Sequence, residues 1–211
     1  MKKIIVFLSL LFILFQLNAQ GSVYKIEKPE NLMNSKIRIE TNWDFYWGKF
    51  VPPYDKNSKP DIVVSAPSDW NKYPLSDDIQ KITKTGKGSG TYRLTLTNLI
   101  PDTKYVFPVY KLAYTAFTIY ADNELIYQAG NPVTEWENTI AEQNFETAAF
   151  FPKSDGTVTL TIFVSNDIYR KGGLRGKITL CEEQYYKDTH YRSLCSYSIF
   201  SGILLMIVLY S

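Results

Sequence analysis

Residues 157–164 read TVTLTIFV, and this stretch decides the fold class. Its apolar residues share one parity (Val158, Leu160, Ile162 and Val164), and threonine occupies positions 157, 159 and 161 of the other. Period-two alternation of β-branched and apolar residues is typical of a strand that buries one face in a core. We therefore expect a half-buried β-strand here.

The same alternation recurs through the middle of the chain. Residues 91–97 (TYRLTLT) place Tyr92, Leu94 and Leu96 on one face. Further strand-like segments are residues 36–40, 104–110, 116–120, 124–128, 144–151 and 176–181. Turn-forming glycine, proline, asparagine and aspartate separate them. Many short strands with regular turns predict an all-β fold, a jelly-roll β-sandwich.

Helices are not expected inside this region. No long amphipathic pattern precedes residue 182, so residues 36–181 are predicted to contain only short helical turns. The polar, lysine-rich residues 76–89 are predicted to form a long loop.

The N-terminus has the layout of a cleaved secretory signal peptide. Lys2 and Lys3 precede the apolar run 4–15, and small residues follow. That run is shorter than the roughly 20 residues that span a bilayer, so a retained anchor helix is the less favoured alternative. We expect cleavage after Ala19.

The C-terminal end has a different pattern. Residues 194–211 contain no charged residue, and positions 202–209 offer no polar residue at helical spacing, as a buried amphipathic helix would require. We interpret this run as the start of a first transmembrane helix, truncated where the sequence ends. The polar residues 183–193 before it are expected to be a membrane-proximal linker or a short helix.

These patterns predict five segments. They are a signal peptide (1–19), an N-terminal lead-in (20–35), an extracellular sensor domain (36–182), the linker (183–193) and the transmembrane start (194–211). The 23 Lys and Arg nearly balance the 21 Asp and Glu, which gives no electrostatic case for a nucleic-acid partner. Two cysteines, Cys181 and Cys195, do not make a disulfide scaffold; separate thiols are favoured, and pairing stays open.

A series of short motifs resembles a known family. The motifs are WDFYW (43–47), APSDWN (66–71), GSGTYRL (88–94), IYADNEL (119–125), VSN (164–166) and YRKGGL (169–174). In this order and spacing they resemble the type 1 extracellular domain of bacterial seven-transmembrane receptors with diverse intracellular signalling modules. The resemblance runs from about Asn42 to the end of the sequence. It implies a galactose-binding-domain-like jelly roll, similar to the sugar-binding domain that precedes the catalytic barrel of many β-galactosidase-like enzymes.

The resemblance also implies a function and a location. The chain is expected to be the sensing part of a bacterial receptor in the cell membrane, facing the periplasm or the cell exterior. Its expected partners are carbohydrate or another small-molecule ligand and the membrane, and a homodimer of the complete receptor stays open. Two alternatives are a sugar-binding module of a secreted glycoside hydrolase and a surface protein-interaction module.

Four residues are candidates for the ligand site. Trp70 and Trp136 could stack on a sugar ring, and Arg93 and Arg170 could hydrogen-bond to its hydroxyl or carboxylate groups. Trp70 could equally be a core residue, whereas the polar surroundings of Trp136 favour exposure. Arg93 shares the parity of the threonine face, so it could simply be solvated or contact an acidic neighbour. The other two tryptophans, at positions 43 and 47, are predicted to lie in the core.

Catalysis has little support in the sequence. His190 is the single histidine and lies in the predicted linker, where it cannot serve as the base of a hydrolase pocket. It has no metal-ligand spacing with the cysteines, and no pair of carboxylates can be singled out for a glycosidase. We therefore expect no enzyme and no cofactor. A structural calcium ion stays open, without ligands that can be named.

Overall fold

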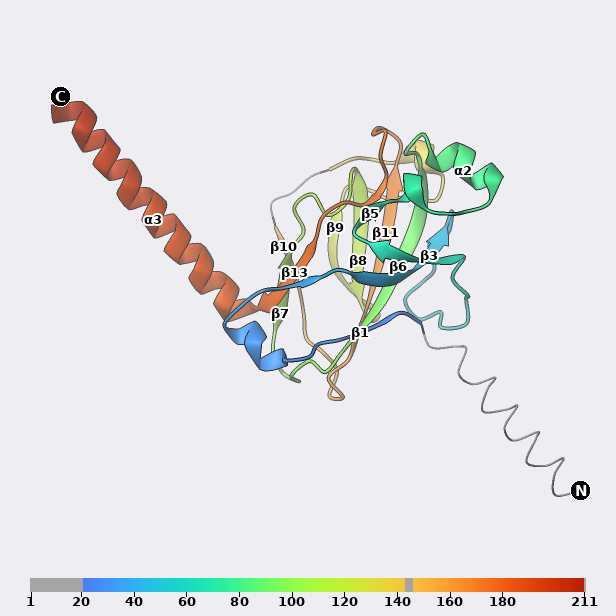
Figure 1. The fold of residues 1–211 in the computed structure, drawn as a ribbon, viewed down its shortest axis with the longest axis horizontal. Helices are drawn as coiled ribbons and strands as arrows, with labels where there is room; N and C mark the ends of the chain where they lie inside the picture. Colours follow the sequence, from blue (N-terminus) through green and yellow to red (C-terminus); the bar gives the residue numbers. More distant parts are fainter. Residues whose placement is uncertain (1–20, 143–145, 211) are drawn as a thin grey trace, which may run out of the picture.

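The strand predicted at 157–164 is the central strand of the larger of two sheets. This strand, β11 (Val158–Asn166), lies between β6 (Gly88–Thr97) and β8 (Ala116–Ala121), and is antiparallel to both. The computed structural model describes residues 21–142 and 146–210, so the predicted signal peptide lies outside the described residues. Figure 1 shows the sheets packed into one body from which a long helix projects.

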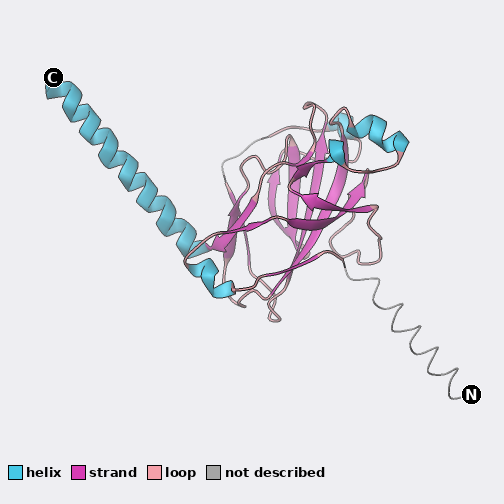
Figure 2. Cartoon of the chain, viewed as in Figure 1, coloured by secondary structure: helices cyan, strands magenta, loops and turns pink. Residues whose placement is uncertain are grey.

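The larger sheet has the order β4-β3-β6-β11-β8-β9, and β1 pairs with β6 in parallel. Its remaining strands are β1 (Val23–Lys25), β3 (Thr41–Trp47), β4 (Ile62–Ala66) and β9 (Glu124–Ala129). The smaller sheet is antiparallel and has the order β10-β7-β13-β2. Its strands are β2 (Ile37–Ile39), β7 (Tyr105–Pro108), β10 (Thr147–Phe150) and β13 (Ile178–Glu182). β5 (Ser68–Asp69) and β12 (Gly173–Leu174) pair as a two-stranded ribbon. Figure 2 shows the strands gathered in one body, from which the longest helix projects.

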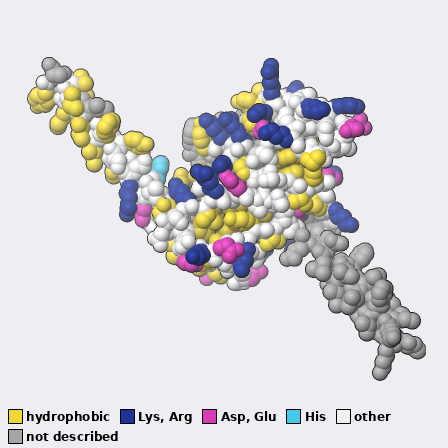
Figure 3. Space-filling view, viewed as in Figure 1, with side chains coloured by type: hydrophobic (Ala, Val, Ile, Leu, Met, Phe, Trp, Pro, Cys, Tyr) yellow, Lys and Arg dark blue, Asp and Glu magenta, His cyan; other side chains and the backbone are white. Residues whose placement is uncertain are grey.

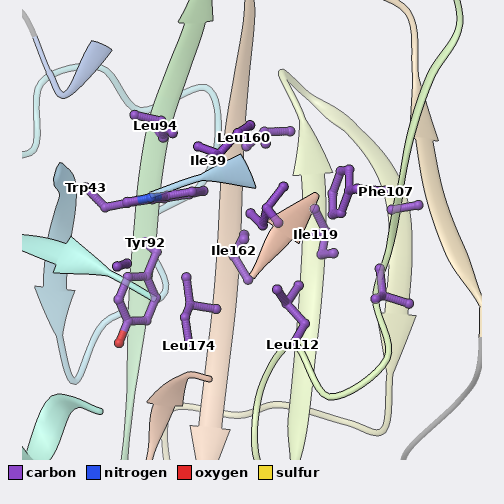
Figure 4. Close-up of a cluster of buried hydrophobic side chains, with 14 of the residues drawn as sticks. Ile39, Trp43, Tyr92, Leu94, Phe107, Leu112, Ile119, Leu160, Ile162 and Leu174 are labelled. Atoms are coloured by element: carbon purple, nitrogen blue, oxygen red, sulfur yellow. The ribbon is translucent and has the colours of Figure 1, made fainter. Parts of the chain in front are cut away.

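The core lies between the two sheets. Leu94, Leu160 and Ile162 of the larger sheet are fully buried and face side chains such as Ile39 and Phe107 of the smaller sheet (Figure 4). The apolar parity predicted for residues 157–164 is therefore the core face. The predicted fold class, an all-β sandwich, is confirmed.

Some elements differ from the sequence prediction. Part of the predicted loop 76–89 forms α2 (Asp77–Thr83), whose first turn carries two aspartates that suit the positive end of the helix dipole. The last two residues of that stretch open β6. Three short 3-10 helices also occur: η1 (Pro29–Met33), η2 (Trp70–Lys72) and η3 (Trp136–Asn138).

Strand β3 shows no alternating pattern of apolar and polar residues, because both of its faces are covered. Trp43 and Phe45 face the core, while Asp44 and Tyr46 are buried on the opposite face. Ser22 donates hydrogen bonds to the Asp44 carboxylate from its backbone N–H (3.0 Å) and its hydroxyl (2.8 Å). A strand buried on both faces loses the polar half of the pattern.

The long helix, α3 (Glu183–Tyr210), starts directly after β13. Its 28 residues span about 42 Å, and it is the helix among the described residues with the length and composition of a membrane span. The predicted linker 183–193 is the first part of this helix. Figure 3 shows charged side chains at its sandwich end and hydrophobic ones toward its tip. Cys181 is buried and Cys195 exposed, and both are free thiols.

Candidate functional site

The outer face of the larger sheet is partly covered by one long loop. Residues 48–61, here called the β3–β4 loop, cross over the side chains of β6 that point away from the core. The Val51 N–H donates to Thr91 Oγ1 (3.0 Å), and the Thr91 hydroxyl donates to the Lys49 carbonyl (2.7 Å). Thr91 thereby attaches the start of the loop to the centre of the sheet.

Arg93 holds the middle of the same loop. Its Nη1 donates to the Asp55 carbonyl (2.7 Å), and its Nη2 donates to the carbonyls of Pro52 (2.9 Å) and Val51 (3.3 Å). The guanidinium also lies 5.5 Å from the ring centroid of Tyr46. Hydrogen bonds from an ionised donor are roughly twice as strong as neutral ones, so this arginine is a strong attachment point.

The loop is further ordered by its own turn. The Asp55 carboxylate accepts hydrogen bonds from the Ser58 hydroxyl (2.6 Å) and from the backbone N–H groups of Asn57 (2.9 Å) and Ser58 (3.1 Å). These bonds favour the ionised form and hold the pKa of Asp55 below its usual value. Near the loop's end, Asp61 accepts from the Trp47 N–H (2.8 Å). These hydrogen bonds hold the β3–β4 loop in one conformation, so that it forms a preorganised wall above the outer face of the larger sheet.

A cleft of ≈ 300 Å³ opens between this wall and the sheet. The rings of Phe50 and Phe163 stack with 4.7 Å between centroids and 2° between planes, and Tyr120 packs against Phe163 at 5.3 Å. Tyr54 is 73% exposed. The complete lining is Phe50, Pro52, Pro53, Tyr54, Tyr120, Asn123 and Phe163.

The lining combines apolar ring faces with a few polar groups. Two tyrosine hydroxyls and the exposed Asn123 amide can donate and accept hydrogen bonds. Such a combination suits a ligand that has a flat apolar face and hydroxyl groups at its edges. The lining contains no carboxylate, histidine or cysteine.

Two buried polar atoms lie next to the cleft without a partner among the described residues. They are Thr161 Oγ1 and Arg93 Nε. Thr161 is paired across the sheet with Arg93 on one side and with Tyr120 on the other, so all three side chains point to the outer face. Buried polar groups are normally hydrogen-bonded. The two neighbouring atoms without a partner, Thr161 Oγ1 and Arg93 Nε, are therefore unusual in this fold.

The structure places Trp70 in the core. It is fully buried, and its Nε1–H donates to the Gly86 carbonyl (2.9 Å). Its ring meets Trp47 edge-on at 5.3 Å, and a Cβ on Gly172 would lie 2.1 Å from its Cε2. Of the two roles that the sequence allowed for Trp70, this structure has the core role.

The other candidates also lie apart. Trp136 is half-buried in η3, with the Lys87 Nζ 5.3 Å from its ring centroid. Arg170 is exposed, and its backbone carbonyl accepts from the Asn71 side chain (3.0 Å). Neither lines the cleft. Of the four predicted residues, Arg93 alone contacts the β3–β4 loop that borders the cleft. Its side chain does not line the cleft itself.

Sequence reasoning missed the aromatic residues of the cleft, although one signal was available. Phe163 occupies the parity that threonine fills elsewhere in 157–164, and Tyr120 has the corresponding position on the neighbouring strand. A large aromatic residue on the water-facing parity of a strand indicates either a covered or a binding surface. As for metals, no group of three or more His, Cys, Asp or Glu side chains within residues 21–142 and 146–210 could hold an ion.

No protein-family model matches the chain, and no curated protein matches it in sequence. Solved structures do resemble it. A glycosyl hydrolase family 2 member from Bacteroides cellulosilyticus has a TM-score of 0.51 at 13% identity, covering 70% of this chain and 20% of that one. A β-galacturonidase of the same family from Eisenbergiella tayi, bound to galacturonate, has a TM-score of 0.45 at 13% identity (70% and 24% covered). The β-glucuronidase from Ruminococcus gnavus scores 0.48 at 11% identity (77% and 31% covered).

The likeness concerns the fold. At 13% identity and a TM-score of 0.51, the sandwich has the architecture of a β-sandwich domain found in family 2 glycosidases. The chain spans about a quarter of the length of the first such glycosidases. The comparisons identify no receptor family, and the likeness extends to the fold alone.

Proposed function

We propose that this chain is a carbohydrate-binding β-sandwich module that α3 holds at the outer side of a cell membrane. The observation that carries the proposal is the cleft, where stacked and tilted aromatic rings form an open apolar surface beside hydroxyl and amide groups. Free sugars offer the complementary surface, an apolar ring face edged by hydroxyls. The glycosidase-like sandwich supports the same ligand class.

The proposed activity is binding without catalysis. A glycosidase of the usual kind needs two carboxyl groups across the scissile bond, about 5–10 Å apart. The cleft lining has none. Its wall is fixed by arginine and aspartate hydrogen bonds to backbone groups, which suits a preformed binding surface.

A glycan array probed with the full chain in detergent tests the proposal. Any glycan that binds is then measured by calorimetry against Phe163→Ala and Tyr120→Ala. Each variant removes one ring face, worth on the order of 1–2 kcal/mol, so affinity should fall about tenfold or somewhat more.

Trp136→Ala is the matched control, because it removes a half-buried aromatic ring that does not line the cleft. Its affinity should equal that of the wild type. The proposal fails if no glycan binds, or if the two cleft variants bind as tightly as the control.

A second candidate function is sensing, as in a receptor, and the junction between β13 and α3 favours it. The strand ends at Glu182 and the helix begins at Glu183, whose carboxylate contacts the Nζ of Lys104 at 2.9 Å and of Lys187 at 3.0 Å. A shift of β13 on ligand binding would therefore move the helix directly. Sensing requires that the ligand has different affinities for two helix positions. Spin-label distances between the sandwich and α3, with and without a bound glycan, would reveal such a change.

A further inference from the structure

A polar groove lies where α3 leaves the sandwich. It has a volume of ≈ 300 Å³ and lies between the end of η1, at Met33 and Asn34, and the first turns of α3. Three charged side chains line it: Glu182, Asp188 and Arg192. The groove thus carries two negative groups and one positive group in a space large enough for a small ligand group.

The charges of this groove are not paired with one another. Each carboxylate uses one oxygen within the helix: Glu182 Oε2 accepts from the Tyr185 N–H (2.9 Å) and Asp188 Oδ1 from the Gln184 amide (2.8 Å). Asp188 and Arg192 are four residues apart, a spacing that allows an ion pair. Within the described residues, none of the three charged groups forms one.

The end of the groove at Arg192 lies at the level of the lipid headgroups if α3 spans a membrane. The uncharged part of α3 begins at Ser193, and its first apolar residue is Leu194, which places the edge of the hydrocarbon there. Along the helix, Arg192 is about 3 Å from Leu194 and Asp188 about 9 Å. The headgroup layer is about 5–7 Å thick on each side of a bilayer, so Arg192 falls within it and the backbone of Asp188 lies about 2–4 Å beyond it.

We propose that this groove binds the headgroup of phosphatidylethanolamine, with the phosphate at Arg192 and the ammonium group at Asp188. The inference rests on the membrane anchoring in the proposed function. The charges occur in the order that this lipid presents, because its phosphate lies next to the hydrocarbon and its ammonium group farther out. An N–H donor of the ammonium group can reach the remaining oxygen of the Asp188 carboxylate.

Other common headgroups fit less well. A choline group has no N–H to donate, so it cannot form charge-assisted hydrogen bonds with Asp188. An anionic glycerol headgroup would bring its phosphate to Arg192 but would meet two carboxylates without a cation to neutralise them. The groove therefore discriminates in favour of a primary ammonium group.

The test uses the full chain in nanodiscs made of phosphatidylcholine mixed equally with phosphatidylethanolamine or with phosphatidylglycerol. After detergent extraction, native mass spectrometry counts the lipids that stay bound. Phosphatidylethanolamine should be retained over each competitor roughly tenfold, as expected for hydrogen bonds to charged groups. Asp188→Asn combined with Arg192→Gln should abolish the preference, and this pair leaves the Glu182 contact with the helix intact.

The matched control is Asp78→Asn with Lys81→Gln, an exposed ion pair on α2, on the opposite side of the sandwich from α3 (Figure 1). It should keep the wild-type preference. Equal retention of all lipids, or a preference that survives in the groove variant, would overturn the groove proposal alone. Preferred retention of phosphatidylglycerol would show that Arg192 binds phosphate unaided, which also overturns it. A chain that fails to enter any nanodisc would refute the anchoring itself.

Discussion

The two faces of the larger sheet use aromatic residues in opposite ways. On the inner face, Phe45, Trp70, Tyr73 and Tyr92 interlock at ring-centroid distances of 4.7 to 6.5 Å and are almost completely buried. On the outer face, the aromatic residues of the cleft pack on one side and remain open on the other. The same residue types therefore stabilise the protein on one face and line an open cleft on the other. Which role a ring has depends on what covers it.

The largest expected effect is on the inner face. Trp70→Ala removes a fully buried ring and its hydrogen bond to Gly86, so it should lower the free energy of unfolding by about 3–5 kcal/mol. The melting temperature should fall by roughly 10 °C, measured by differential scanning fluorimetry. Trp136→Ala should cost less, about 1–2 kcal/mol, because its ring is only half-buried. Equal melting temperatures for the two variants would contradict the core role of Trp70.

The second prediction concerns the β3–β4 loop, which forms the wall of the cleft on the outer face. Arg93→Met keeps the aliphatic stem but removes the hydrogen bonds to the carbonyls of Val51, Pro52 and Asp55. We expect a loss of about 2–3 kcal/mol and new protease cleavage within the β3–β4 loop. Arg38→Met, an exposed arginine on β2, should change neither measurement. A loop that stays resistant in the Arg93 variant would show that other contacts hold the wall.

Alkaline pH should weaken the contribution of the buried tyrosines on the inner face. Burial raises the pKa of Tyr73, and it raises the pKa of Tyr92 well above its usual value of 10. The folded state therefore keeps protons that the unfolded state releases, so this contribution to stability is complete below pH 10 and is lost as the pH rises through the folded-state pKa values. Each such proton adds a slope of about 1.4 kcal/mol per pH unit. Urea unfolding between pH 9 and 11 measures the slope, and Tyr73→Phe should reduce it.

The smallest effect concerns the unpaired hydroxyl on the outer face. Thr161→Val keeps the shape of the side chain and removes a buried oxygen that has no partner among the described residues, so stability should stay the same or rise by up to about 1 kcal/mol. Thr91→Val is the comparison, because its hydroxyl makes two hydrogen bonds and its loss should be destabilising. If chemical denaturation shows equal losses for both, Thr161 has a hydrogen-bond partner in solution, such as a bound water.

The contrast between the faces also explains what the sequence could predict. Alternation identified β6 and β11, because each has one dry face whose residues Leu94 and Leu160 repeat at period two. It could not show that Trp70 is enclosed, since the enclosing groups come from Gly86 and Gly172, distant in sequence. The cleft was missed for the same reason. It exists because a loop between β3 and β4 folds back over Phe163, and such a tertiary contact leaves no periodic signal.

The junction between β13 and α3 has a consequence for how the module would meet its ligand. A domain on a flexible tether of n residues samples a sphere whose radius grows as about 5–6 Å × √n, and it can turn its binding surface in any direction. Here the backbone passes from strand to helix within one residue, and the Lys104–Glu183 ion pair spans the passage. In a membrane-anchored chain, the cleft would then keep a constant orientation relative to the bilayer plane. The rate of glycan binding would depend on the direction from which the glycan approaches. A glycan that lies along the cell surface would reach the cleft at a different rate from one that approaches with its end first.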